Sequence, residues 1–269
     1  MNVVTIRSTM IAVALLIIPA LLLIPAVKVG AQMLPPPDWD HYLPFHVQPP
    51  ITWAGQIELS DQFGLSLHDQ FVLTHLALPV DKNNEGIFDD VLHYTWWEIF
   101  SDEGIWNVVA ENQFGTQLLQ VSNARYLWNP ALKNSNGAPG DVGPGLPFAN
   151  HYKCYDARGP LVGLEVSLAH QFDPGIHTEV LEPVLFCNPA KKFHVDTGQV
   201  NDILDPDRHY VCYRLQPPVT LGVQVGFADQ FVSEFLDLDF SDVLCVPTIK
   251  TGFVQAEASS WGRLKAIYR

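Results

Sequence analysis

Apolar and polar residues alternate along several segments of the chain, and this alternation predicts β-strands. It is clear at 51–59, where Ile51, Trp53, Ile57 and Leu59 are spaced by polar or small residues. The same pattern returns at 164–168 and 219–227. A period of two with β-branched and aromatic side chains is typical of a strand with one buried face. The pattern therefore predicts an all-β protein.

A second kind of segment is apolar on both faces. In HYVCYRL, residues 209–215, Tyr210 and Cys212 share one face, and Val211 and Tyr213 share the other. This predicts a central strand that is covered on both sides. A third kind, such as 177–189, reads as a strand that bends near Pro183, because proline cannot donate to a sheet ladder. These segments together predict antiparallel units of three or four strands.

The segments recur because the chain contains one unit four times. Three short marks keep the same order at nearly constant spacing, which is strong evidence for internal repetition. The marks are His-Tyr at 41, 93, 151 and 209, Gln-Phe at 62, 113, 171 and 230, and Pro-x-x-Lys at 79, 130, 189 and 247. Repeats one to four are accordingly residues 41–82, 93–133, 151–192 and 209–250.

The four cysteines follow this frame. Cys154 and Cys212 stand three residues after the histidine, and Cys187 and Cys245 stand two residues before the proline, in repeats three and four only. Because both members of a pair are present or absent together, the repeat predicts disulfides Cys154–Cys187 and Cys212–Cys245 out of three possible connectivities. The alternative is a four-thiolate zinc site, although no C-x-x-C spacing supports it.

The motifs HYKCY at 151–155 with LFCNPAKK at 185–192, and HYVCY at 209–213 with VLCVPTIK at 243–250, resemble a family. It is a tandem secreted domain of unknown function from exported bacterial and archaeal proteins. The resemblance is good over repeats three and four, and weaker over one and two, which lack the cysteines. It implies a fold and an exported location and supplies no chemistry.

The N-terminus predicts export. Arg7 precedes an uninterrupted apolar run from Met10 to Val27. Small residues at 29–31 then suit a cleavage site after Ala31, so residues 1–31 read as a secretory signal peptide. The run is long enough that retention as a membrane anchor is the alternative. An exported chain with an even cysteine count fits an extracellular or periplasmic location, where disulfides persist.

Charge limits the partners. The whole chain has a formal charge of −14, and without Arg7 and Lys28 the remaining 13 basic and 29 acidic residues give −16. Such a surface repels nucleic acid and anionic lipid. We therefore expect a protein or glycan partner, no nucleic acid, and a membrane only if the N-terminal segment is retained.

Composition of the linkers sets the expected domains. Residues 32–40 are a proline-rich lead-in, and 134–149 are the most glycine- and proline-rich linker. We predict two sandwich- or barrel-like domains, 41–133 and 150–250, each a pair of repeats, with a tail at 251–269 that could hold a short basic helix. A single repeat is too small to bury enough surface alone. A four-bladed propeller with one blade per repeat is the alternative.

No catalytic motif is present. The chain lacks a G-x-S-x-G elbow, an H-E-x-x-H pair and a phosphate loop. Asp202, Asp205 and Asp207 form an acidic cluster that could bind calcium. They are weak candidates because their spacing does not match that of a calcium-binding loop. No cofactor is expected. The Gln-Phe pair is expected at a turn, with the phenylalanine in the core and the glutamine hydrogen-bonded to the turn backbone. The alternative is that the glutamine binds a ligand.

Repeat two holds the remaining candidates. Trp96 and Trp128 occupy the cysteine positions, so they are expected to touch in place of a disulfide. If Trp97, Trp106 and Trp128 were exposed instead, they would form a binding platform for sugar rings or a partner protein. The sequence therefore favours a secreted, non-catalytic β-repeat protein acting as a structural or binding module. The alternative is a carbohydrate-binding protein or hydrolase that uses these tryptophans.

Overall fold

The computed structural model describes residues 39–134, 146 and 148–255. The predicted signal segment, most of the lead-in and of the linker at 134–149, and residues 256–269 of the tail lie outside this range. All regular structure in the described part is β, as the alternation predicts. The strands are β1 (His41–Asp61), β2 (Gly64–Lys82), β3 (His93–Asn112), β4 (Gly115–Asn134), β5 (His151–Arg158), β6 (Leu164–His170), β7 (Asp173–His194), β8 (Val200–Asn201), β9 (His209–Ala228) and β10 (Ser233–Gln255).

Each repeat is one long β-hairpin rather than a unit of three or four strands. The His-Tyr segment and the alternating segment after it form one continuous strand in repeats one, two and four, and are divided into β5 and β6 in repeat three. Pro49 and Pro50 lie where the β1–β2 ladder changes register, so the prolines bend the strand instead of ending it. In β7 the ladder is irregular on both sides of Pro183, which is the bend expected there.

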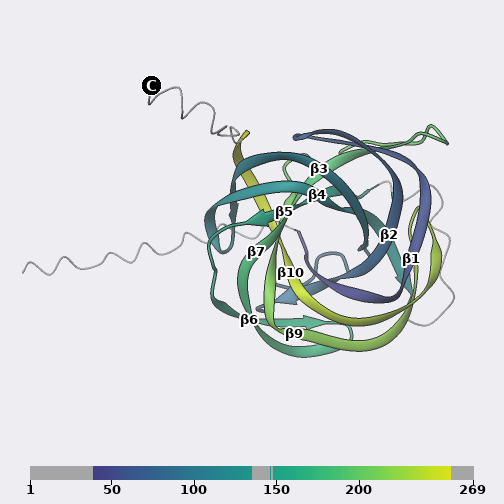
Figure 1. Ribbon diagram of the computed structural model, residues 1–269. Coiled ribbons are helices and arrows are strands. Elements are labelled where there is room, and N and C mark those ends of the chain that lie inside the picture. The colour runs from purple at the N-terminus through teal and green to yellow at the C-terminus, as the bar shows by residue number, and fades with distance from the viewer. Residues whose placement is uncertain (1–38, 135–145, 147, 256–269) are drawn as a thin grey trace, which may run out of the picture. The chain divides into compact units, whose positions relative to one another are not determined.

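Eight of the strands close into one ring. The second strand of each hairpin pairs with the first strand of the next, giving contacts β2–β3, β4–β5, β7–β9 and finally β10–β1. Figure 1 shows these strands curving around a common centre. The boundary predicted at 134–149 therefore does not separate two domains, because β4 and β5 pair across it and the described residues on both sides belong to one compact unit. A propeller is also excluded for the described residues, since the repeats share one continuous sheet.

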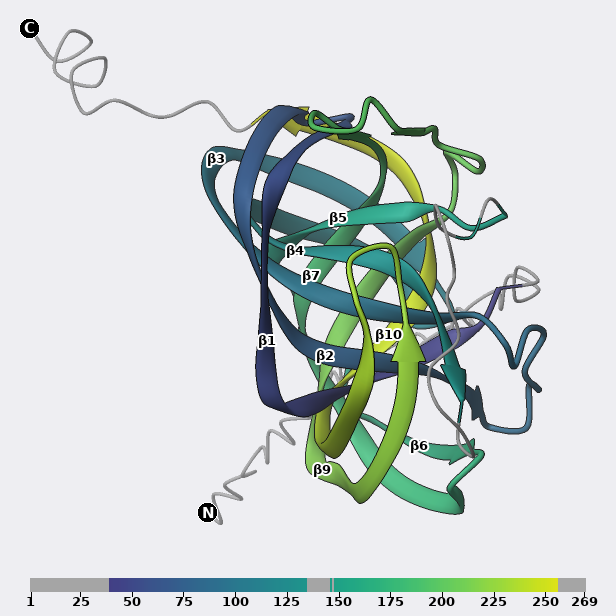
Figure 2. The ribbon, with the colours of Figure 1, turned by 90° about the vertical axis from the view of Figure 1, so that its right-hand side faces the viewer.

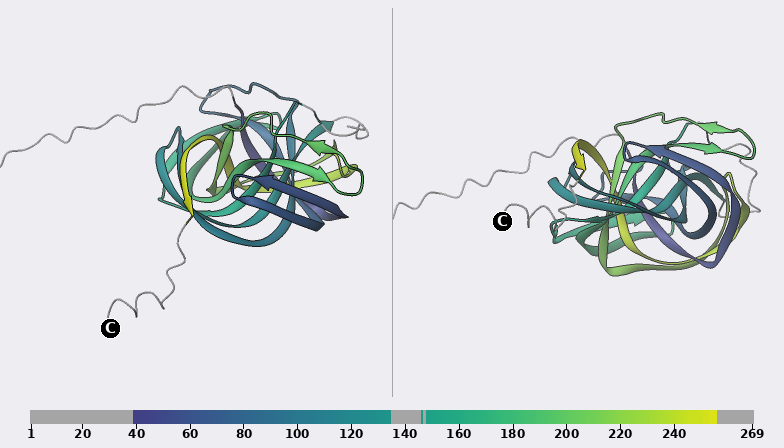
Figure 3. Two further views of the ribbon diagram at one scale, coloured as in Figure 1. Left: turned by 90° about the horizontal axis from the view of Figure 1, so that it is seen from above. Right: turned by 45° about the horizontal axis from the view of Figure 1, so that its top comes forward.

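The outer half of each hairpin then crosses to the repeat two places further on. Residues Ile57–Ser60 of β1 pair with the end of β7, and the other three hairpins do the same through β3–β10, β2–β6 and β4–β9. Figures 2 and 3 show the long strands wrapping around the unit in this way. Every repeat consequently contacts all three others.

Two cores result from the alternation of side chains. The face that carries the His-Tyr tyrosines points inward, because Tyr42, Tyr94, Tyr152 and Tyr210 contact one another in a closed cycle with ring centroids 5.1–5.8 Å apart. The opposite face holds a larger aliphatic and aromatic core, against which the turn phenylalanines pack. The described residues include no helix that is long and apolar enough to cross a membrane.

Because the ring closes through pairing between the two halves of the chain, neither half should fold alone. A fragment of residues 32–140 would expose the edges that β5 and β10 cover in the whole chain. We expect fragments 32–140 and 141–269 to show no cooperative melting separately, and to regain the near-ultraviolet circular dichroism of the whole chain when refolded together. Independent cooperative melting of either fragment would contradict the shared ring.

Candidate functional site

The turn at the end of each hairpin is stabilised in the same way in every repeat. The residue before Gln-Phe accepts a hydrogen bond from the backbone N–H of the phenylalanine two residues later. Asp61 and Asp229 also accept a second one, from Gly64 and Val232. Such side-chain caps are the local reason that Asp and Asn favour turns. The four cap residues are Asp61, Asn112, His170 and Asp229.

Each turn lies on the repeat two places away. Phe63 of repeat one contacts Tyr155 of repeat three, Phe114 of repeat two contacts Tyr213 of repeat four, and Phe231 of repeat four contacts Trp97 of repeat two, each with ring centroids 5.1 Å apart. The turn of repeat three reaches repeat one through His170 and Phe45, at 5.5 Å. The aromatic residue after the cysteine position thus receives the turn of the opposite hairpin.

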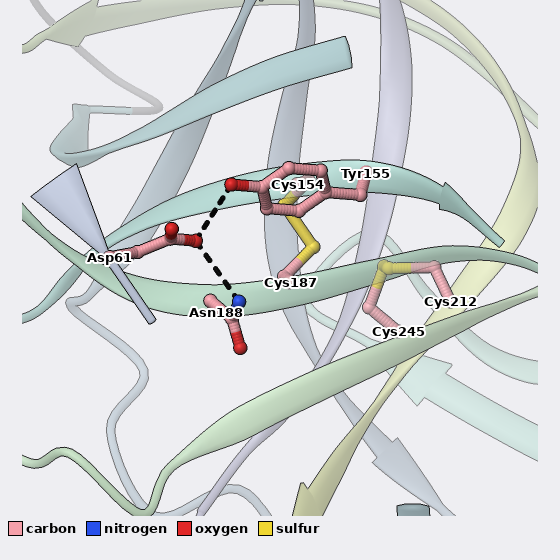
Figure 4. The surroundings of a disulfide bond; sticks show 7 residues. All are labelled: Asp61, Cys154, Tyr155, Cys187, Asn188, Cys212 and Cys245. Carbon is pink, nitrogen blue, oxygen red and sulfur yellow. Dashed lines mark hydrogen bonds between the residues drawn. A yellow bond between two sulfur atoms is a disulfide. The ribbon is translucent and has the colours of Figure 1, made fainter. Parts of the chain in front are cut away.

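At two of these contacts, a carboxylate of the turn accepts hydrogen bonds from donors of the opposite repeat. Asp61 accepts hydrogen bonds from the Tyr155 hydroxyl at 2.9 Å and from Asn188 Nδ2 at 3.0 Å, as Figure 4 shows. Asp229 accepts from Trp97 Nε1 at 2.7 Å and from the Thr95 hydroxyl. Burial raises the pKa of Asp61, although the Lys153 charge and the Asn188 hydrogen bond lower it.

The other two contacts are neutral. Asn112 donates to the Tyr213 hydroxyl at 2.8 Å, and this hydroxyl in turn donates to Gln117. Phe45 has no polar atom in its side chain, and the cap that meets it is His170. Each cap residue therefore meets a different set of partners on the repeat that receives it.

Three lysines of the Pro-x-x-Lys mark lie beside the turn of the following repeat, whereas Lys82 pairs with Glu85. Lys192 Nζ is 4.8 Å from the centre of the Phe231 ring, Lys250 is 5.2 Å from that of Phe63, and Lys133 is 5.3 Å from that of Phe172. Lys192 is fully buried, and it donates to Asn129 Oδ1 at 2.6 Å and to Gln230. Burial lowers the pKa of Lys192 well below its usual value and that of Lys250 to about 8.

Two of the turn glutamines, Gln113 and Gln230, bond to side chains of the preceding repeat or of the segment after it rather than to turn backbone. Gln113 lies 2.5 Å from His41 Nε2, and Gln230 receives the Lys192 hydrogen bond and donates to Asn201. The His-Tyr histidines are themselves buried, which lowers the pKa of His41 to about 3 and those of His93 and His209 to about 4. These repeated residues join one repeat to the next.

The inner core contains the two disulfides that the repeat spacing predicts, Cys154–Cys187 and Cys212–Cys245. The described residues contain no free cysteine, so a zinc site has no ligands there. Trp96 and Trp128 face each other across β3 and β4 with ring centroids 4.8 Å apart, as expected for the positions that replace a disulfide.

The predicted binding platform is not available at the surface. Trp97 and Trp128 are 0% exposed and Trp106 is 6% exposed. Trp97 and Trp106 belong to the outer core, where they meet the turns of other repeats, while Trp128 contacts the tyrosine cycle. The hairpin tips of other repeats cover Trp97 and Trp106, which the sequence of repeat two alone does not reveal.

The calcium candidates are engaged with other groups. Asp202 pairs with Lys191 at 2.7 Å, and Asp205 lies 3.4 Å from Arg208 and accepts the Asp207 N–H. Within the described residues, no three His, Cys, Asp or Glu side chains are arranged to hold a metal ion.

Sequence reasoning missed the polar contacts between repeats. Asn129 and Asn188 both directly precede the proline of the third mark, and both accept a hydrogen bond from a lysine of the next repeat; Asn188 also donates to the cap residue Asp61. Their recurrence at one position of the repeat was the available signal, but no local pattern shows which repeat they would contact.

Replacement of Trp128 by Ala should be costly. It would leave a cavity beside Trp96, and we expect a loss of about 3–5 kcal/mol in the free energy of unfolding. Urea denaturation of the whole chain measures this change. Leu67→Ala, at a side chain that is 59% exposed, is the control and should change stability by less than about 0.5 kcal/mol. Equal effects of the two variants would contradict a core role for Trp128.

The buried histidines predict acid lability. Their pKa values are lowered in the folded state, so the unfolded chain binds more protons below pH 6.5 and stability falls as pH decreases toward about 4. The raised pKa values of Asp40, Asp61 and Asp156 act in the opposite direction, but these are three groups against seven buried or half-buried histidines of the described residues whose pKa is lowered. We expect a lower urea midpoint at pH 5 than at pH 7.

The variant His93→Gln should reduce this pH dependence, whereas His177→Gln, at an exposed position, should leave it unchanged. A midpoint that does not change between pH 7 and pH 5 would show that these histidines are not buried as neutral groups.

Comparison with known proteins agrees with the repeat structure. A family model described as a repeat of unknown function, DUF7450, matches residues 93–247. The match runs from the His-Tyr mark of repeat two to the third mark of repeat four, so it includes a repeat without cysteines. No curated protein and no solved structure matches the chain. Since the matched residues are more than half of the sequence, the chain belongs to this family of repeats of unknown function.

Proposed function

We propose that this chain is an exported, non-catalytic module with a structural or binding role outside the cytoplasm. The observation that carries the proposal is the use of the repeated polar residues. Several cap residues, lysines and glutamines of the repeat frame, together with His41, bond to other repeats. Chemistry on a substrate would require such groups to converge at an accessible site.

The covalent links support the location. Two disulfides close the hairpins of repeats three and four, and the two cysteines of each are 33 residues apart in the sequence. A loop of that size contributes about 3–4 kcal/mol in the chain-entropy model. Disulfides persist in oxidising compartments, in agreement with the signal segment expected at residues 1–31.

The acidic surface supports the class of partner. A formal charge of −14 on the whole chain favours basic or neutral partners over nucleic acid and anionic membranes. A protein or glycan partner is therefore the class we propose. The alternative of a carbohydrate hydrolase built on repeat-two tryptophans loses its support, because these rings are buried.

The location can be tested in cells that express the full chain. We expect N-terminal sequencing of the mature protein to begin at Gln32, and protease added to intact cells to reach the protein while a cytoplasmic marker stays protected. Export would be refuted if the protein kept residues 1–31 and was protected from the added protease as the cytoplasmic marker is.

The absence of catalysis can be tested on the purified mature chain. Chitin, cellulose and peptidoglycan serve as glycan probes, with release of reducing ends as the readout. We expect no release above a heat-denatured control, whether or not the protein sediments with the polymer. Steady release that depends on protein concentration would overturn the non-catalytic role, and co-sedimentation without release would identify a glycan partner.

A further inference from the structure

Two lysines, Lys192 fully buried and Lys250 half-buried, lie against the side-chain amide of an asparagine. Lys192 Nζ lies 2.6 Å from Asn129 Oδ1, and both residues are 0% exposed. At the equivalent place one repeat later, Lys250 Nζ lies 3.5 Å from Asn188 Oδ1. In both cases the lysine comes from one repeat and the asparagine from the repeat before it.

A carboxyl group from the turn of the following repeat lies near each lysine, and at Asn188 it also contacts the amide. Asp61 Oδ2 accepts a hydrogen bond from Asn188 Nδ2 at 3.0 Å, so it contacts the nitrogen of the amide itself. Asp229 lies close enough to Lys192 for its charge to act on the ammonium group. Thr95 links Asp229 to the backbone carbonyl of Asn129.

The surroundings make the lysines nucleophilic. Lys192 lies over the Phe231 ring and Lys250 over the rings of Phe63 and Phe253. Burial lowers the pKa of both amines, that of Lys250 to about 8, so the neutral amine is populated near neutral pH. A desolvated neutral amine is the form of lysine that attacks a carbonyl carbon.

The asparagine and the acid are present together or absent together. Repeats two and three have Asn129 and Asn188 before the proline, and the turns that serve them supply Asp229 and Asp61. In repeats one and four the same position is Leu78 or Val246, and the corresponding turn residues are His170 and Asn112. All four lysines remain. Lys82, which meets no asparagine, pairs instead with Glu85.

We propose that Lys192 and Asn129, and likewise Lys250 and Asn188, join as intramolecular isopeptide bonds. The lysine amine forms a bond to the asparagine Cγ, and the bond from Cγ to Nδ2 breaks. The products are a secondary amide and one molecule of ammonia. Atoms and electrons balance without an oxidant, a cofactor or a second substrate.

The acid moves the protons of this step. Asp61, whose pKa is raised by burial, can give its proton to the departing Asn188 nitrogen and take one from the attacking Lys250 amine. At Lys192 and Asn129, which are both fully buried, the surrounding core excludes the water that would hydrolyse the amide instead. The reaction goes beyond the proposed structural role and does not depend on any partner of the protein.

The bonds would tie together hairpins that the disulfides leave separate. Lys192–Asn129 connects repeats three and two, and Lys250–Asn188 connects repeats four and three, whereas each disulfide lies within one repeat. With both kinds of link, repeats two, three and four become one covalent network.

The measurement is the intact mass of the purified mature chain, followed by peptide mapping. Each isopeptide bond removes one ammonia, about 17 Da. We expect a deficit of about 34 Da after allowance for the two disulfides, and branched peptides that contain Lys192 with Asn129 and Lys250 with Asn188. A mass equal to that of the disulfide-bonded sequence overturns the proposal. A branch from Lys192 to Gln230, the other amide that it contacts, overturns the assignment to Asn129.

Three variants test the roles. Asn129→Ala and Asp229→Asn should each halve the mass deficit, while Lys133→Met, at a lysine whose repeat position has no asparagine to meet, should leave it unchanged. Near-ultraviolet circular dichroism checks that each variant is folded. Asp229→Asn preserves size, so it remains decisive if Asn129→Ala does not fold. A full deficit in folded Asp229→Asn would show that the carboxyl group takes no part.

Discussion

The structure depends on the docking of each hairpin turn on the repeat two places away. A repeat of about 40 residues cannot bury enough apolar surface alone, and a simple ring of hairpins would leave its outer face exposed. The turns solve both problems, because their phenylalanines cover the aromatic residue of the opposite repeat at the same 5.1 Å centroid distance in three of the four cases. The tyrosine cycle fills the inner face in the same fourfold manner.

This docking explains why polar residues are buried at fixed positions of the repeat. A turn has backbone N–H groups that need hydrogen-bond acceptors. When the turn is buried in a core, these N–H groups cannot bond to water. Asp61 and Asp229 supply the acceptor from within the turn, and their second oxygen meets a donor of the opposite repeat. One side chain thus satisfies the local turn and fixes its place on another repeat.

Local features of this architecture follow from sequence, and long-range ones do not. Alternation predicts strands, and the common spacing predicts both disulfides, because partners in one hairpin lie at fixed offsets. The bends at Pro49 and Pro50 look like strand ends in sequence, since a proline breaks a ladder in either case. The linker at 134–149 looks like a domain boundary, yet β4 and β5 pair across it. Burial of Trp97 depends on a turn more than 130 residues away in the chain, Asp229 to Phe231, and no periodicity encodes that contact.

Four similar hairpins could in principle dock in a wrong order, and the matched pairs act against this. If the His170 turn met Tyr155, the tyrosine hydroxyl would lose its carboxylate acceptor, and if Asp61 met Phe45, a buried carboxylate would lose a donor. An unpaired buried polar group costs about 1–3 kcal/mol, and more when charged, so each mismatch is comparable to a tenth or more of the total stability of a domain. The differences between repeats at these positions therefore specify their order around the ring, while the features they share build the ring itself.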